Sequence, residues 1–184
     1  MKRVLICSGW VGRFLKHKMK QKLGIIGFGN MGSSIALRLK TKYRVYAFDQ
    51  DKNKTKGLSG IKVVPSNIDL VNQVDTVMLA VKPQDFAPAL EEIKDYINKK
   101  LLITIAAGIS TDYIERYNIG KVRVIRVMPN IPARVGRSMS CLSKGKFATR
   151  KDLKFSIILF SYLGNTLVLN EEMMNAATAI SGSG

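Results

Sequence analysis

Three glycines and one aspartate have the spacing of a site that binds a dinucleotide. Gly27, Gly29 and Gly32 form the pattern Gly-x-Gly-x-x-Gly after the apolar run 23–26, and Asp49 ends a second apolar run 20 positions after Gly29. The first glycine permits a tight turn, the second lets backbone approach a pyrophosphate, and the third lets a helix lie close to the strand. We expect the pyrophosphate on free N–H groups at the helix N-terminus and the ribose hydroxyls on the Asp49 carboxylate.

The composition is that of a globular protein with an excess of positive charge. The chain has 184 residues, 46% of them hydrophobic and 23% charged, and a formal net charge of +17. An excess of this size is also found in proteins that bind nucleic acid, but here the basic residues are scattered and no stretch interleaves them with stacking aromatics. We therefore predict a dispersed lysine-rich surface and no nucleic-acid partner.

Cysteine and histidine are too few for several kinds of chemistry. Cys7 and Cys141 are the only cysteines, which excludes a disulfide framework and gives no metal-ligand spacing. We predict no metal site, a reducing cytoplasm as the compartment, and no membrane partner, because no apolar run approaches the length of a membrane span. Cys141 is expected to be buried rather than reactive. The only histidine, His17, precedes the glycine motif, so imidazole acid–base catalysis is not expected.

Residues 1–18 differ from the rest of the chain. They carry five lysines or arginines and no acidic residue. The apolar stretch 4–11 is short and lacks a small-residue cleavage site, which argues against a signal peptide. Because the first strand of a nucleotide-binding fold normally lies near the N-terminus, we expect Met19 to be the functional start and residues 1–18 to be a disordered or artefactual extension.

From the glycine motif onward, apolar runs alternate with amphipathic segments. This alternation predicts an α/β fold, a Rossmann-type doubly wound and mostly parallel sheet. We expect a dinucleotide-binding domain over 19–170 and the start of a truncated helical domain over 171–184. The strands are expected at 44–48, 61–64, 76–81, 101–105, 121–127, 139–142 and 166–169, and the helices at 33–40, 67–71, 83–97, 111–117, 149–163 and 171–180.

Three strand ends carry residues that could line a ligand crevice. Lys82 follows the most apolar strand and could face phosphate or a ribose, or be an ordinary solvated lysine. The small residues 106–108 could admit a flat ring or simply pack tightly. The loop Met128-Pro129-Asn130 is rigid and lies at another strand end. Ligands bind outside the carboxyl ends of such strands, so all three are candidate binding edges.

Six segments together resemble pyrroline-5-carboxylate reductase, the last enzyme of proline synthesis. They occur in the family's order and spacing and cover essentially all of residues 22–184. The segments are Ile-Ile-Gly-Phe-Gly-Asn-Met-Gly (25–32), Ala-Val-Lys-Pro-Gln (80–84), Ile-Ala-Ala-Gly-Ile (105–109), Arg-Val-Met-Pro-Asn-Ile-Pro-Ala (126–133), Tyr-Leu-Gly (162–164) and Ala-Thr-Ala-Ile-Ser-Gly-Ser-Gly (177–184).

The resemblance implies reduction of 1-pyrroline-5-carboxylate to L-proline by hydride transfer from NADPH or NADH, in a protein that forms a homo-oligomer. It also assigns residues to the cofactor and to the vicinity of the substrate. The implied cofactor residues are Ile26, Gly27, Phe28, Gly29, Asn30, Met31, Gly32, Asp49, Asn67, Ala80, Val81, Lys82, Pro83, Ala106, Ala107 and Gly108, and the implied substrate-proximal residues are Met128, Pro129 and Asn130.

The sequence departs from the family in three respects. The family continues beyond Ser-Gly-Ser-Gly with a helical domain that builds the dimer and supplies most of the substrate site, so the catalytic residues stay unassigned. Arg134 and Arg137 stand where the family usually has apolar, small or acidic residues. Asp49 disfavours the 2′-phosphate of NADPH, whereas Lys52 and Lys54 could offset that repulsion, which leaves the cofactor preference open.

Two other functions remain alternatives. The chain could belong to another NAD(P)-dependent small-molecule reductase of the same fold, or it could be a nucleotide-binding module without catalysis. Because the helical domain is absent, we expect the chain itself to bind cofactor with little or no turnover.

Overall fold

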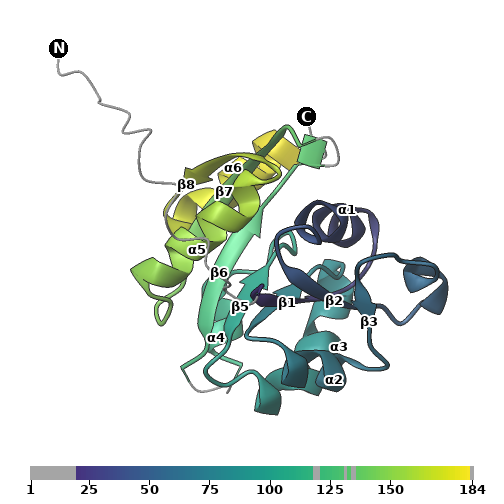
Figure 1. The fold of residues 1–184 in the computed structure, drawn as a ribbon. Coiled ribbons are helices and arrows are strands. Elements are labelled where there is room, and N and C mark those ends of the chain that lie inside the picture. The colour runs from purple at the N-terminus through teal and green to yellow at the C-terminus, as the bar shows by residue number, and fades with distance from the viewer. Residues whose placement is uncertain (1–19, 118–120, 131, 134–135, 183–184) are drawn as a thin grey trace, which may run out of the picture.

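The computed structural model describes residues 20–117, 121–130, 132–133 and 136–182. The predicted N-terminal extension, His17 and Cys7 lie outside the described residues. The described chain forms one eight-stranded sheet in the order β3-β2-β1-β4-β5-β6-β7-β8 (Figure 1). Its strands are β1 (Lys22–Ile26), β2 (Arg44–Phe48), β3 (Lys62–Val63), β4 (Thr76–Leu79), β5 (Leu101–Thr104), β6 (Arg123–Met128), β7 (Ser138–Lys144) and β8 (Gly164–Val168).

The strand directions confirm the predicted mostly parallel sheet. Strands β1 to β6 pair in parallel, and the order reverses at β1, which lies between β2 and β4. Strand β7 runs antiparallel to β6, and β8 is parallel to β7. The reversal next to β1 is the switch point at which doubly wound sheets leave a crevice for a ligand.

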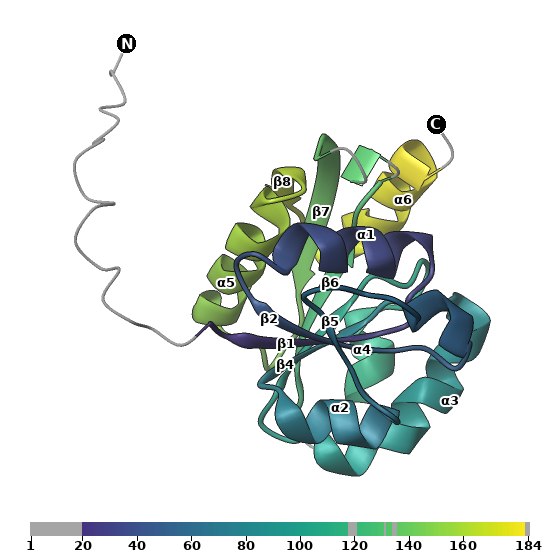
Figure 2. The same cartoon turned by 45° about the vertical axis from the view of Figure 1, so that its right-hand side comes forward.

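Helices cover both faces of the sheet, as Figure 2 shows for α1 on one side and for α2, α3 and α4 on the other. The apolar residues of α1 and α5 belong to one core cluster, and those of α2, α3 and α4 belong to a second. The α-helices are α1 (Asn30–Leu39), α2 (Asn67–Gln73), α3 (Pro83–Ile93), α4 (Thr111–Glu115), α5 (Arg150–Ser161) and α6 (Met174–Gly182), and the short 3-10 helices include η1 (Lys52–Thr55), η2 (Lys94–Tyr96) and η4 (Glu171–Met173).

Burial explains why the central strands are apolar on both sides. Every residue of β4 and β5 is buried, as expected for parallel strands that have helices on both faces. The predicted stripe of α3 is confirmed, because Phe86, Leu90 and Ile93 are completely buried. Burying a side chain of this size contributes about 1.5–3 kcal/mol, so the two helix layers supply much of the stability.

Several element boundaries differ from the prediction, and those of α1 and α3 have clear physical reasons. Helix α1 begins at Asn30 rather than at 33, with Gly29 as its N-cap, because the glycine loop turns directly into the helix. Helix α3 ends at Ile93 and continues as η2, although the stripe extends to the buried Ile97. A 3-10 turn advances the chain more steeply than an α-turn and still points that side chain inward.

The second half of the sheet contains two further predicted features. Cys141 on β7 is 5% exposed, which confirms its predicted burial, and this burial raises the pKa of the thiol. Thr149 caps α5 as expected and forms a capping box with Asp152. Among the described residues, no helix is long and apolar enough to cross a membrane.

The segment 171–182 packs on the sheet. Helix α6 contacts β6 and β7, and Met174 is completely buried. Arg126 of β6 is 2% exposed and forms an ion pair with Glu171, its Nη1 lying 2.8 Å from Glu171 Oε1. Arg126 Nη2 also donates to Asn175 Oδ1 at 3.0 Å. Leaving a buried charge without its partner costs several kcal/mol of stability. These contacts with Arg126 therefore hold the segment 171–182 against the sheet.

Candidate dinucleotide-binding site

The glycine loop lies at the carboxyl end of β1, where the backbone makes close contacts. Gly27 has a φ of +93°, and a Cβ at this position would lie 2.7 Å from the carbonyl oxygen of Ala80. A Cβ on Gly32 would lie 2.1 Å from the carbonyl oxygen of Gly27. The first and third glycines are therefore required by the fold itself, as the spacing predicted.

The second glycine has a different environment. Gly29 has φ −70° and ψ −166°, which any residue adopts, and no described atom lies within 4 Å of the position of its Cβ. As the N-cap of α1 it supplies no side chain, and within the described chain the first turn has no side-chain cap. The N–H groups of this turn therefore face an open space, an arrangement that fits a pyrophosphate.

Asp49 joins the end of β2 to the glycine loop. Its Oδ2 accepts a hydrogen bond from the backbone N–H of Phe28 at 2.7 Å. Its Oδ1 accepts from the N–H of Asp51 at 2.9 Å and from Lys54 Nζ at 3.2 Å. Only 10% of the Asp49 side chain is exposed. The carboxylate thus holds the loop in place, and a carboxylate with about four acceptor positions still has capacity for a ribose hydroxyl.

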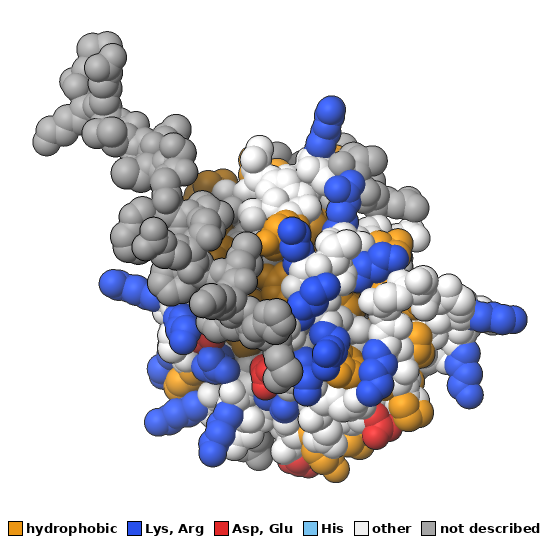
Figure 3. Space-filling view, in the orientation of Figure 1, with side chains coloured by type: hydrophobic (Ala, Val, Ile, Leu, Met, Phe, Trp, Pro, Cys, Tyr) orange, Lys and Arg blue, Asp and Glu red, His pale blue; other side chains and the backbone are white. Residues whose placement is uncertain are grey.

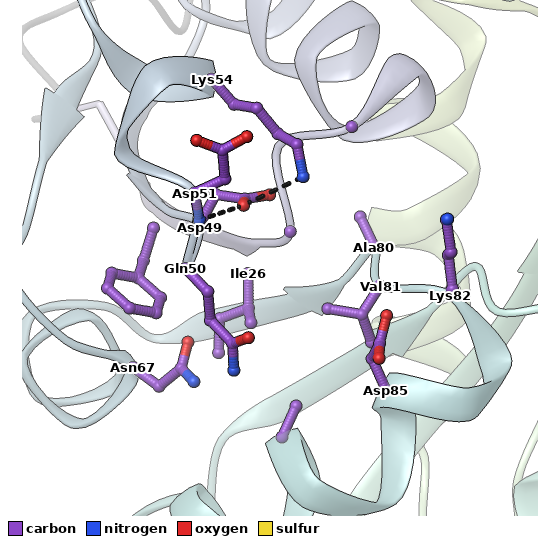
Figure 4. Close-up of a pocket in the computed structure, with 14 residues that line it drawn as sticks. Ile26, Asp49, Gln50, Asp51, Lys54, Asn67, Ala80, Val81, Lys82 and Asp85 are labelled. Atoms are coloured by element: carbon purple, nitrogen blue, oxygen red, sulfur yellow. Dashed lines mark hydrogen bonds and ion pairs between the residues drawn. The ribbon is translucent and has the colours of Figure 1, made fainter.

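A pocket of about 270 Å³ opens between the glycine loop, the end of β2 and the start of α3. Figure 4 shows the side chains that surround it, with Lys54 bonded to Asp49 on one side and Lys82 and Asp85 on another. Ligand pockets are commonly 300–1,000 Å³, so this one suits part of a dinucleotide. Its lining residues are Ile26, Gly27, Gly29, Phe48, Asp49, Gln50, Asp51, Lys54, Asn67, Ala80, Val81, Lys82, Asp85 and Ala89.

The charges at the pocket contrast with those of the whole chain. The lining includes the carboxylates of Asp49, Asp51 and Asp85 and the ammonium groups of Lys54 and Lys82. Elsewhere Lys and Arg side chains are spread over much of the face shown in Figure 3, which agrees with the predicted dispersed basic surface. The carboxylates can accept hydrogen bonds from the hydroxyl groups of a dinucleotide. Its phosphates are negatively charged, so they fit the N-terminus of α1 and the two lysines instead.

Asn67 begins α2 and lines the pocket although it is only 2% exposed. Its Nδ2 donates to Oε2 of Glu92 on α3 at 2.7 Å. Its Oδ1 is buried and has no hydrogen-bond partner among the described residues. Leaving a carbonyl oxygen buried without a donor costs about 1–3 kcal/mol, so a ligand that donates to it would regain that energy.

The other predicted cofactor residues are arranged around this pocket or farther along the same edge. Those in the glycine loop and α1 (Phe28, Asn30, Met31 and Gly32) and Pro83 at the start of α3 adjoin lining residues without lining the pocket themselves. Ala106, Ala107 and Gly108 follow β5, two strands from β1. They can serve only a part of a ligand that extends from the pocket along the carboxyl edge.

The predicted substrate-proximal residues lie at the end of β6 and directly after it, at the same edge. Pro129 is buried, and Met128 and Asn130 are partly exposed. Asn130 Oδ1 accepts from the N–H of Met139 at 3.1 Å, which ties the loop to β7. Asn130 therefore fixes the shape of this strand end. Arg134 lies outside the described residues, and Arg137 is exposed.

Known proteins are similar to most of this chain. A family model described as NADP oxidoreductase coenzyme F420-dependent matches residues 22–108. A pyrroline-5-carboxylate reductase of Methanosarcina acetivorans is 39% identical over 173 residues, which are 89% of this chain and 64% of that protein. By this similarity the chain corresponds to the N-terminal part of pyrroline-5-carboxylate reductases. The Arabidopsis thaliana enzyme of this name is 36% identical, and the match covers 89% of this chain and 62% of that protein.

A solved structure gives the same family. The crystal structure of Plasmodium falciparum pyrroline carboxylate reductase with NADP bound is similar with a TM-score of 0.82 and 29% identity, over 90% of this chain and 64% of that one. This chain therefore spans less than two thirds of the pyrroline-5-carboxylate reductases that it matches. These matches leave more than a third of each relative's length without a counterpart in this sequence.

Several residues that line this pocket were not predicted from the sequence. Gln50 and Asp51 follow Asp49 directly, and Asp85 and Ala89 lie one turn apart on α3. The first two follow the end of a strand, and the other two lie in the first turns of a helix that starts at the sheet edge. These positions could have indicated that they line a ligand site. Glu92 has no such signal, because it acts through a side-chain contact 25 residues distant in the sequence.

Proposed function

We propose that this chain binds NADPH or NADH along the carboxyl edge of the sheet, with the pyrophosphate at the N-terminus of α1. The observation that carries the proposal is the open first turn of α1 next to Gly29, because a helix N-terminus without a side-chain cap leaves several N–H donors for an anion. Asp49 then accepts from the adenosine ribose, and Lys82, Pro83 and residues 106–108 lie along the path toward the nicotinamide.

We further propose that, together with the part of its relatives' length that this sequence does not span, the chain serves the reduction of 1-pyrroline-5-carboxylate to L-proline. The bound cofactor supplies a hydride to the imine carbon while the ring nitrogen keeps a proton, which yields the secondary amine. A cyclic imine protonates readily, so alignment matters more than a side-chain acid, and good alignment contributes about 7–11 kcal/mol in favourable cases. The loop 128–130 would form one wall beside the reacting ring.

Binding is tested by calorimetric titration of the 184-residue chain with NADPH and with NADH. We expect saturable binding of at least one of them, together with a rise in melting temperature that grows with ligand concentration. A cooperatively unfolding chain that binds neither nucleotide would contradict the proposal.

The reaction is tested with a chimera in which the C-terminal part of the Methanosarcina acetivorans relative follows this chain. We expect oxidation of NADPH or NADH that depends on 1-pyrroline-5-carboxylate, and little or none from the chain alone. A folded chimera that binds cofactor and reduces other cyclic imines, but not this one, would favour a different reductase. Cofactor binding without turnover of any imine would favour a non-catalytic module.

A further inference from the structure

One residue beside the pocket has no role in the proposed function so far. Glu92 of α3 is exposed and does not line the pocket, yet its Oε2 accepts a hydrogen bond from Asn67 Nδ2 at 2.7 Å. Asn67 is 2% exposed and does line the pocket. The contact joins the first turn of α2 to the last turn of α3, so it links an exposed carboxylate to a buried amide at the ligand site.

The Glu92 carboxylate determines the orientation of the Asn67 amide. An ionised carboxylate only accepts hydrogen bonds, whereas an amide has a donating NH₂ group and an accepting oxygen. The NH₂ group must therefore face Glu92, and the oxygen must face away. That oxygen is buried and has no partner among the described residues. Because buried polar groups in folded proteins are nearly always paired, the partner is expected to come from outside the chain.

We infer that Glu92 is a positioning residue, which holds the Asn67 oxygen as an acceptor for an N–H or O–H donor on the adenosine half of NADH or NADPH. The inference rests on the proposed function. The pocket lies at the ends of β1 and β2, where the adenosine half of a dinucleotide binds in this class of sheet. The hydrogen-bond donors of the adenosine half are the amino group of the base and the ribose hydroxyls.

The pocket has room for such a donor to reach Asn67. Figure 4 shows Asn67 beside Gln50, with Lys82 and Asp85 on the opposite side. Gln50 is exposed, and in the described part of the chain its side chain makes no hydrogen bond. Its side chain is therefore able to change rotamer as a ligand enters the pocket.

The neighbouring glutamate provides a matched control. Glu91 is exposed on the same helix, pairs with Lys94 and does not line the pocket. Glu92→Ala releases the Asn67 amide, and we expect it to weaken binding of the cofactor about three- to tenfold, the effect of one neutral hydrogen bond. Glu92→Gln can accept from the Asn67 NH₂ group but can also donate to the Asn67 oxygen, so its affinity for the cofactor is expected to lie between those of Glu92→Ala and the wild type. Glu91→Ala is expected to change nothing at the site.

The experiment is a calorimetric titration of the 184-residue chain and these variants with NADH, NADPH and reduced nicotinamide hypoxanthine dinucleotide, which lacks the base amino group. Melting temperatures check that Glu92→Ala folds, as expected for alanine at an exposed helix position. If the base amino group is the donor, Glu92→Ala weakens binding of NADH and leaves the affinity for the hypoxanthine form unchanged. If a ribose hydroxyl is the donor, Glu92→Ala weakens both forms equally. Either result, with partial recovery in Glu92→Gln, supports the inference.

Two results would overturn it and are distinguishable. Wild-type affinity for NADH in Glu92→Ala overturns the positioning role and leaves the proposed cofactor binding intact. Absence of nucleotide binding by the folded wild-type chain overturns the proposed function and this inference with it.

Discussion

The glycine loop allows cofactor binding to be separated from folding by two single substitutions. Gly29→Ala places a methyl group where no described atom lies within 4 Å, in a backbone conformation that alanine adopts. Gly32→Ala places it 2.1 Å from the Gly27 carbonyl oxygen. If the open space next to Gly29 holds a pyrophosphate, the first change obstructs the ligand, whereas the second disturbs the fold.

The stability effects follow from opposing contributions. At Gly29, alanine reduces the entropy of the unfolded chain, which stabilises by about 0.4–1 kcal/mol. Alanine is also a poorer N-cap than glycine, which costs a similar amount of order 1 kcal/mol. We therefore expect an unfolding free energy within about 1 kcal/mol of the wild type. At Gly32 the backbone must shift, which costs about 1–3 kcal/mol or more, partly offset by the roughly 1 kcal/mol helix preference of alanine.

Binding is expected to show the reverse order. A methyl group at Gly29 keeps the pyrophosphate from the N–H groups of α1, and we expect at least a tenfold loss of affinity for NADH and NADPH, about 1.4 kcal/mol. Calorimetric titration measures the affinity, and urea unfolding measures the stability. Wild-type affinity in a stably folded Gly29→Ala variant would refute the assignment of the pyrophosphate to this loop.

Three further results are expected. Lys54→Ala should change the free energy of unfolding by less than about 1 kcal/mol, because the Lys54 side chain in its pair with Asp49 is about half exposed. The same change should weaken binding of NADPH more than binding of NADH, which the ratio of the two dissociation constants checks. Glu171→Ala should destabilise by about 3 kcal/mol and more than Arg126→Met does, because it leaves the 2% exposed Arg126 without its ion-pair partner, whereas Glu171 is partly exposed and keeps the N–H of Thr111 as a donor. Urea unfolding of both variants measures the two losses, and equal losses would contradict the prediction. Thr149→Ala should cost about 1 kcal/mol through loss of the capping box, with Thr149→Ser near the wild type, as measured by thermal unfolding.

Strands and layers were predictable because their signals are local. The apolar runs that become β4 and β5 are uninterrupted, and buried parallel strands need such runs. The boundaries of α1 and α3 were less predictable. Gly29 gives no polar cap signal, and the spacing of Ile93 and Ile97 is compatible with one continuous helix, although η2 lies between them. The antiparallel direction of β7 depends on tertiary pairing with β6 and has no local signal.

The site was predictable where a backbone requirement dictates the residue type. Gly27 and Gly32 have no space for a side chain, and the spacing to Asp49 reflects the length of one helix and one strand. The contact between Asn67 and Glu92 could not be predicted, because it depends on how α2 and α3 pack. The support that Asp49 gives to the loop, in addition to its proposed contact with a ribose, became visible only with its hydrogen bonds.

The most direct test of the account is the calorimetric titration of the wild-type chain with NADH and NADPH, next to Gly29→Ala under the same conditions. The account predicts saturable binding of at least one nucleotide by the wild type and a loss of at least about tenfold in the variant, with similar unfolding curves for both. A wild-type chain that unfolds cooperatively but binds neither nucleotide would contradict the claim that this edge of the sheet is a dinucleotide site.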